Sequence, residues 1–254
     1  MLAIIGGTGL TQLASLEVSQ RQIMRTPYGA PSGPLTLGVI GQQALVFLAR
    51  HGYGHTIPPH EINYRANVWA LQACGASAIV SVASVSCIRP DLKPGDLVIP
   101  EQMIDYTWGR KSTYHDGQSC TVTHIDFSQP YDAALRQRLL AAAASSGVPC
   151  SDHAVYAAMQ GPRLETTAEV ERLARDGADV VGMTGMPEAV LARELGIAYA
   201  AINVVANYAA GRAPLASAPP STPPSTPPQS GGQTSTLQTA MQQVHTLIER
   251  LLVN

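Results

Sequence analysis

Leu2-Ala3-Ile4-Ile5-Gly6-Gly7-Thr8-Gly9 opens the chain with an apolar run that ends in a glycine-rich turn. The run has the composition of a buried strand, and glycines at its end let the backbone approach a ligand closely. Backbone N–H groups and the Thr8 hydroxyl at such a turn can bind phosphate, although a tight turn without a ligand has the same composition. The stretch predicts the first strand of an α/β fold and a candidate phosphate site.

A second candidate for phosphate binding is the pair Arg50-His51, which follows the apolar segment Ala44–Leu48. A guanidinium at the end of a buried strand needs an anionic partner, because an unpaired charge is expensive to bury. That partner is either a bound anion or one of the chain's own acids. The forked geometry of arginine suits phosphate, so we expect Arg50 to bind phosphate, with an internal ion pair as the alternative.

The fold class follows from the alternation of short aliphatic runs with longer helical patterns. We expect one α/β domain over residues 1–254, with a central mixed, largely parallel β-sheet flanked by helices. The expected strands are Leu2–Ile5, Leu35–Val39, Ala44–Leu48, Ala78–Val82, Leu97–Pro100, Val155–Ala158, Val180–Gly182 and Ala198–Ala206. The expected helices are Asn63–Cys74, Tyr131–Ser145, Thr166–Asp176, Pro187–Leu195 and Leu237–Leu252.

Local signals mark several helix ends. Thr166 and Glu169 have the spacing of a capping box, and Pro187 suits a first helical turn. Residues 213–235 are rich in Pro, Ser and Thr, so we expect a mobile spacer there, partly in the polyproline conformation. The helix over 236–252 carries apolar residues at steps of three and four, which predicts that it docks on the body of the protein.

Composition excludes several classes of partner. The 254 residues include 16 Lys and Arg against 18 Asp and Glu, a net charge of -2, which gives no general attraction to nucleic acid or to an anionic membrane. No stretch has the length of a membrane span, and the amino terminus lacks the features of a signal peptide. The four cysteines are widely spaced, which is typical of reduced thiols in a cytoplasmic protein.

Two cofactor hypotheses are disfavoured by spacing. The glycine-rich turn lacks the third glycine of the dinucleotide fingerprint, whose position is Gln12, and no acid follows at the usual distance, so NAD is not expected. His51, His55 and His60 lie on a segment rich in Gly and Pro without the helical scaffold of zinc signatures. We therefore expect no metal.

A series of motifs resembles the trimeric purine nucleoside phosphorylase family, in its methylthioadenosine/methylthioinosine phosphorylase branch. The resemblance covers nearly all of residues 1–212, and the shared motifs occur in the same order. They are Gly6-Gly7-Thr8-Gly9-Leu10, Arg50-His51-Gly52, Pro58-Pro59-His60-Glu61-Ile62-Asn63-Tyr64-Arg65-Ala66-Asn67, Pro94-Gly95-Asp96-Leu97-Val98-Ile99, Gln160-Gly161-Pro162-Arg163 and Gly182-Met183-Thr184-Gly185-Met186-Pro187-Glu188.

The resemblance implies a site for phosphate and sugar. The residues expected to bind phosphate are Thr8, Arg50, His51, Ser84 and Thr184. The backbone near Met183 corresponds to the part of the family's site that meets the ribose hydroxyls. The resemblance further implies a homotrimer, phosphate and a nucleoside as small-molecule substrates, and no metal or organic cofactor.

The same resemblance assigns the base site to Glu165, Asn207 and Leu164. Members that act on 6-oxopurines carry Glu and Asn at the first two positions, whereas adenine-selective members have Asp at the second and another Asp at the position of Ala209. A carboxylate can accept the N1–H of hypoxanthine, and the amide can bond O6 and N7 as the base departs. Without the resemblance, Glu165 could equally be an acid at a helix N-terminus and Asn207 a turn residue.

Three departures from the family bear on function. Ala83-Ser84-Val85-Ser86-Cys87 replaces a segment in which relatives have glycines, Leu164 replaces an aromatic residue that stacks on the base, and the spacer lies where relatives close the 5′ side of the pocket. We expect phosphorolysis of a 6-oxopurine nucleoside, most simply S-methyl-5′-thioinosine, with Asn207 and His51 taking part in catalysis. The alternatives are a methylthioadenosine phosphorylase, a general inosine/guanosine phosphorylase, and an inactive nucleoside-binding protein.

Overall fold

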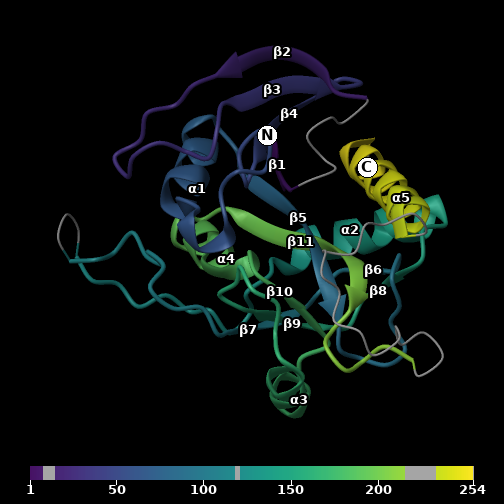
Figure 1. The fold of residues 1–254 in the computed structure, drawn as a ribbon. Coiled ribbons are helices and arrows are strands. Elements are labelled where there is room, and N and C mark those ends of the chain that lie inside the picture. Colours follow the sequence, from purple (N-terminus) through teal and green to yellow (C-terminus); the bar gives the residue numbers. More distant parts are fainter. Residues whose placement is uncertain (8–14, 118–120, 215–232, 254) are drawn as a thin grey trace.

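The computed structural model describes residues 1–7, 15–117, 121–214 and 233–253, which form one α/β assembly (Figure 1). The strands are β1 (Leu2–Gly6), β2 (Glu17–Gln22), β3 (Leu35–Ile40), β4 (Gln43–Ala49), β5 (Ala78–Cys87), β6 (Leu97–Val98), β7 (Gln102–Asp105), β8 (Cys150–Ser151), β9 (Val155–Ala158), β10 (Val180–Gly182) and β11 (Ala198–Tyr208). The helices are η1 (Pro59–Glu61), α1 (Tyr64–Ala73), α2 (Ala133–Ser146), α3 (Thr167–Arg175), α4 (Gly185–Glu194) and α5 (Gln233–Val253).

The described strands form one mixed sheet that branches at β5. The main path runs β2-β3-β4-β1-β5-β10-β9-β7, and β11 pairs with β5 off this path. β5 pairs in parallel with β1 and with β11, while its far end pairs antiparallel with β10. The parallel pairs include β1 with β4, β9 with β10 and β7 with β9. The predicted α/β class with a mixed, largely parallel sheet is confirmed.

The core consists of helices on both faces of this sheet. Successive residues of β1 point to opposite faces, so Ala3 and Ile5 belong to a buried cluster with residues of α1 and α4. Ile4 belongs to a second cluster with residues of α2 and α5. Figure 1 shows the two helix pairs on opposite sides of the strands. Because both faces are covered, the strands read as continuous apolar runs.

The predicted strands and helices are all present, but several boundaries differ. β5 extends five residues and β11 two residues beyond the predicted ends, since each continues to pair with the other. Three strands were not predicted: β2 is mostly polar and exposed, β7 has four residues, and β8 has only two. The expectation for Pro187 was wrong: Met186 and Pro187 have non-helical backbone angles within α4, so the regular turns begin after them.

The C-terminal helix lies against the body of the protein. Val244, Ile248 and Leu251 of α5 are buried in one cluster with Leu135 and Leu139 of α2. Most of the predicted spacer, residues 215–232, lies outside the described residues. Among the helices that are described, none combines the length and the apolarity needed to cross a membrane.

Candidate active site

A cavity of about 290 Å³ opens where the parallel strands β1 and β4 end, next to the end of β10 and the last residues of β11. Ligands of open α/β sheets bind at this carboxyl edge. Every predicted site residue that the structure describes lines the cavity, namely Arg50, His51, Ser84, Leu164, Glu165, Met183, Thr184 and Asn207. Thr8 lies outside the described residues, but Gly7 immediately before it lines the same cavity.

The guanidinium of Arg50 is held by a buried acid. Nε and Nη2 donate to the two carboxylate oxygens of Glu188 at 2.8 and 2.9 Å. Nη2 also donates to the Ser81 hydroxyl at 2.6 Å, and Nη1 donates to the Val82 carbonyl at 3.1 Å. Within the described residues these bonds engage every N–H of Arg50 except one on Nη1. The internal ion pair is therefore present, and Arg50 lines the cavity as well.

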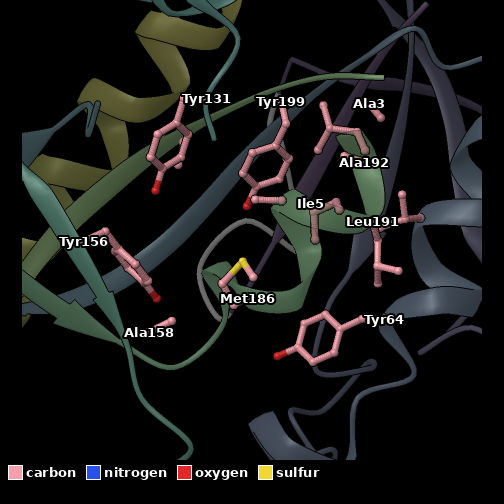
Figure 2. Close-up of a cluster of buried hydrophobic side chains, with 14 of the residues drawn as sticks. Ala3, Ile5, Tyr64, Tyr131, Tyr156, Ala158, Met186, Leu191, Ala192 and Tyr199 are labelled. Carbon is pink, nitrogen blue, oxygen red and sulfur yellow. The ribbon is translucent and has the colours of Figure 1, made fainter. Parts of the chain in front are cut away.

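Both side chains of this ion pair are buried, so each charge needs the other to remain stable in the interior. The side chains of Arg50 and Glu188 are 1% and 0% exposed. Burial alone disfavours the charged guanidinium, but the Glu188 carboxylate outweighs it and the pKa of Arg50 is raised. The Tyr199 hydroxyl donates to the same carboxylate at 3.0 Å. Figure 2 shows Tyr199 beside Tyr131, and both belong to one buried hydrophobic cluster.

His51 is a neutral imidazole with a defined tautomer. Its Nδ1 lies 2.8 Å from the Ile57 carbonyl oxygen, which can only accept, so Nδ1 carries the proton. Burial lowers the pKa of His51 to about 4, and the positive charge of Arg50 acts in the same direction. At neutral pH the Nε2 atom is therefore an acceptor rather than a donor.

The turn that carries Thr184 is supported by a tyrosine. The Tyr156 hydroxyl accepts from the backbone N–H groups of Thr184 and Gly185 at 3.2 and 3.3 Å. Gly185 packs so closely on the Tyr156 ring that a Cβ there would lie 2.8 Å from Cε1. The Thr184 side chain makes no cap bond with α4. Thr184 thus lines the cavity on a turn that the Tyr156 hydroxyl holds in position.

Glu165 does not occupy the position of a helix-capping acid. Thr166 is the N-cap of α3, and the predicted capping box with Glu169 is confirmed by both of its hydrogen bonds. Glu165 precedes the cap and lines the cavity, while Glu169 is the acid of the first turn. Burial raises the pKa of Glu165, and the neighbouring carboxylate of Glu169 adds to the effect. Leu164 lines the cavity and is 66% exposed.

Asn207 is aimed into the cavity by an irregularity in β11. The register with β5 shifts between Val205 and Asn207, so Ala206 is an extra residue and both Ala206 and Asn207 line the cavity. The Asn207 amide nitrogen donates to the Tyr208 carbonyl at 3.1 Å, which distinguishes its nitrogen from its oxygen. Asn207 is therefore part of a strand and not of a turn.

The segment Ala83–Cys87, where relatives have glycines, is a regular part of a strand. Residues 83–87 continue β5, with Ser86 opposite Asn207 of β11 and opposite Val181 of β10. Ser84 lies opposite Val204 and is exposed where it lines the cavity. The loss of glycine thus leaves the strand pairing intact and presents a hydroxyl to the cavity.

The histidines of the described segments have few neighbours of the metal-ligand types. His51 and His55 are ring neighbours with centroids 4.3 Å apart, and His60 lies 3.6 Å from the Glu61 carboxylate. Over the described ranges, no three side chains among His, Cys, Asp and Glu are grouped as metal ligands would be. The expectation that no metal is bound stays a prediction.

Sequence reasoning missed the residues that support the site from behind. Glu188 was noted only as part of a motif, and Ser81, Tyr156, Tyr199 and Arg110 carried no signal of their own. An acid within the otherwise apolar stretch of α4 is the one local hint, because such a residue needs a buried cation. Met241 of α5 also lines the cavity, which the apolar stripe of that helix did not reveal.

Comparison with known proteins finds similarity to nucleoside phosphorylases. The chain is 55% identical over 210 residues to a probable S-methyl-5′-thioinosine phosphorylase of Pseudomonas syringae pv. tomato, covering 83% of this chain and 85% of that protein. It is 45% identical over 215 residues to a 6-oxopurine nucleoside phosphorylase of Pyrococcus furiosus, covering 83% and 80%. A methylthioadenosine phosphorylase structure from an antarctic soil metagenomic library superimposes with a TM-score of 0.88 at 34% identity, covering 99% and 85%.

The family model described as the phosphorylase superfamily matches residues 1–252. That span contains all the strands that end at the cavity and the helix that supplies Met241. A match of this extent, with relatives at about half identity over most of both chains, shows that this chain belongs to the phosphorylase superfamily.

Proposed function

We propose that this protein catalyses phosphorolysis of S-methyl-5′-thioinosine, releasing hypoxanthine and 5-methylthioribose 1-phosphate. The observation that carries the proposal is that Arg50, His51, Glu165 and Asn207 line one cavity. Ser84 and Thr184, which have hydroxyl groups, line the same cavity. The first two supply groups for an anion, and the next two supply groups for a purine edge. No cofactor or metal is part of the proposal.

Phosphate occupies the part of the cavity next to Arg50. The remaining N–H on Nη1 and the Ser84 and Thr184 hydroxyls donate to phosphate oxygens. A hydrogen bond to a charged group contributes about 1.5–3 kcal/mol, so a few of them hold the dianion. Neutral His51 accepts the hydroxyl hydrogen of hydrogen phosphate through Nε2, which leaves the other oxygens free to act as the nucleophile.

The reaction exchanges one bond at C1′. A phosphate oxygen attacks C1′ as the bond from C1′ to N9 breaks, and the purine leaves with the electron pair. The proton carried by hydrogen phosphate ends on the purine, so atoms and charge balance. Positive charge grows on the sugar in the transition state and is stabilised by the adjacent phosphate, while the site holds both reactants in line.

Glu165 and Asn207 read the base. The Glu165 carboxylate accepts the N1–H of a 6-oxopurine, whereas the unprotonated N1 of adenine would face it without a hydrogen. One N–H of the Asn207 amide is bonded to the Tyr208 carbonyl, and the second N–H donates to O6 of the base. The amide oxygen of Asn207 accepts the N7–H of the departing base. A site that depends on such a buried bond can reject the wrong analogue by up to ~10⁴-fold.

The 5′ end of the substrate is read by apolar groups. Pro59 and Met241 line the cavity, and a thioether with a methyl group is better matched to them than a 5′ hydroxyl is. The two relatives quoted above by sequence are named for methylthioinosine and for 6-oxopurine nucleosides, whereas the quoted structure is named for methylthioadenosine. The pair Glu165 and Asn207 favours the 6-oxopurine.

The experiment offers methylthioinosine, inosine and methylthioadenosine to the purified protein, each with and without phosphate, and measures base release by chromatography. We expect phosphate-dependent hypoxanthine release, fastest from methylthioinosine. Faster adenine release would assign the protein to methylthioadenosine, and equal rates with inosine would remove the 5′ preference. Binding of nucleoside with no phosphate-dependent release of any base would leave only a binding function.

We further propose that the protein works as a homotrimer. The support is the likeness to the trimeric branch of the family, and light scattering of the purified protein measures the mass directly. A mass of one chain under assay conditions would reject the trimer without affecting the proposed reaction.

A further inference from the structure

Arg110 connects two loops that carry different parts of the cavity wall. It lies in the segment after β7, within a stretch that has no helix or strand in its described residues. Nη2 donates to the carbonyl oxygens of Met159 and Gln160 at 3.2 and 2.8 Å, and Nε donates to the Gln160 side-chain oxygen at 3.2 Å. Nη1 donates to the carbonyl oxygens of Met183 at 2.9 Å and of Met186.

The two groups of carbonyls belong to segments that bear different site residues. Gln160 lies five positions before Glu165, at the start of the loop that leads to α3. Met183 and Met186 flank Thr184, on the turn after β10. Arg110 itself is absent from the cavity lining, so it touches both loops without facing the substrate.

The charge of Arg110 is satisfied almost entirely by backbone oxygens. In the described part of the chain no carboxylate lies within ion-pair distance of it. Its remaining contacts are the Tyr64 hydroxyl, 3.2 Å from Nη1, and the Tyr64 ring, whose centroid lies 5.4 Å from the guanidinium carbon. A planar fork of five N–H groups can hold carbonyls on two loops at once, which an ammonium cannot reproduce.

We propose that Arg110 is a positioning residue that fixes the distance between the base-reading loop at Glu165 and the turn at Thr184. The proposal rests on the function proposed above. The base and the phosphate must be held on opposite sides of C1′ at the same time, so a shift of one loop against the other separates the reactants. Misplacement by about 1 Å is enough to reduce the rate about 100-fold.

The test compares Arg110→Ala and Arg110→Lys with a matched control, Arg89→Ala. Arg89 also donates through all three nitrogens, to Asp91, Ser151 and the His153 carbonyl, but none of these partners lines the cavity. We expect kcat to fall at least about 100-fold in Arg110→Ala, with a smaller change in KM for phosphate, because alignment affects the transition state most. Arg89→Ala should keep kcat within about threefold of the wild-type value, since surface ion pairs contribute little.

Two further readouts separate positioning from general damage. Added guanidinium ion at a concentration that does not unfold the protein should restore part of the activity of Arg110→Ala, and Arg110→Lys should stay impaired. Hydrogen exchange of the ligand-free protein should speed up at residues 159–165 and 183–186 in the Arg110 variants and not in Arg89→Ala. Exchange does not depend on turnover, so it reports on Arg110 even if the wild-type protein releases no base.

The proposal is overturned if Arg110→Ala keeps wild-type kcat and wild-type exchange in both loops. It is equally overturned if activity falls only in proportion to the folded fraction measured by circular dichroism, because the residue would then be merely structural. Absence of any phosphorolysis in the wild-type protein would instead reject the proposed function.

Discussion

At the scale of single residues, the buried pair of Arg50 and Glu188 is the most sensitive part of the site. Arg50 was expected either to bind an anion or to pair with an internal acid, and it pairs with Glu188 while also lining the cavity. The acid fixes the guanidinium and neutralises its charge, so a bound phosphate dianion is attracted mainly through individual N–H bonds. Removing the acid should therefore change the response to phosphate as well as the stability.

The first prediction concerns Glu188→Ala. Leaving the Arg50 cation buried and unpaired should lower the free energy of unfolding by about 3–5 kcal/mol. Phosphate then becomes the remaining anionic partner, so added phosphate should raise the melting temperature of Glu188→Ala more than that of the wild-type protein. Thermal unfolding with and without phosphate measures both effects.

The control for this variant is Asp91→Ala, which breaks the exposed pair with Arg89. That change should lower stability by less than about 1 kcal/mol and leave the phosphate response unchanged. An equal phosphate-induced shift in Glu188→Ala and wild-type protein would mean that Arg50 does not reach phosphate.

At the scale of secondary-structure elements, the N-terminus of α3 sets the place of the base-reading acid. Thr166 is the N-cap of α3, and Glu165 comes immediately before this cap. The cap therefore fixes the backbone next to Glu165, which lines the cavity. The irregularity in β11 has a similar effect on Asn207, because the extra residue lets Ala206 and Asn207 both line the cavity. Both side chains are thus aimed by local backbone features.

The prediction at this scale is that Thr166→Ala weakens base recognition. Loss of the cap should lower stability by about 1 kcal/mol and raise KM for the nucleoside several-fold, while KM for phosphate stays unchanged. Asp132→Ala removes the corresponding cap of α2, where Asp132 accepts from the Leu135 N–H at 2.8 Å. The two variants should lose similar stability, but only Thr166→Ala should alter KM; equal KM changes in both would contradict the role of the cap.

At the scale of the whole molecule, the sequence predicted the elements that carry the site better than the contacts behind it. The apolar run of β1 leads to Gly7 and that of β4 leads to Arg50, so the edge where the cavity forms could be predicted. Arg110 lies 73 residues before Met183, and Arg50 lies 138 residues before Glu188. Such pairings are set by the topology of the sheet, which a local pattern does not contain.

The stability of the folded chain should depend on pH through His51. Its pKa is about 4 in the folded protein against 6.5 when unperturbed, so the unfolded chain binds the proton more readily. The contribution of neutral His51 is complete above pH 6.5 and is lost as pH falls toward 4, up to a limit of about 3 kcal/mol.

Urea unfolding of wild-type protein and His51→Asn, at a fixed protein concentration, measures this dependence. The difference in unfolding free energy between them should shrink steadily as the pH is lowered from 7 to about 4.5, since only the wild type has the titrating group. A difference that stays constant over that interval would show that His51 takes up its proton equally in both states.

The cavity has one wall from Gly7, near the first residue of the chain, and another from Met241, near the last. The segments that supply these two walls lie far apart in the sequence and meet only in the folded molecule. Met241 belongs to the same helix whose Val244, Ile248 and Leu251 are buried against α2, so the packing of α5 also holds one wall of the cavity in place.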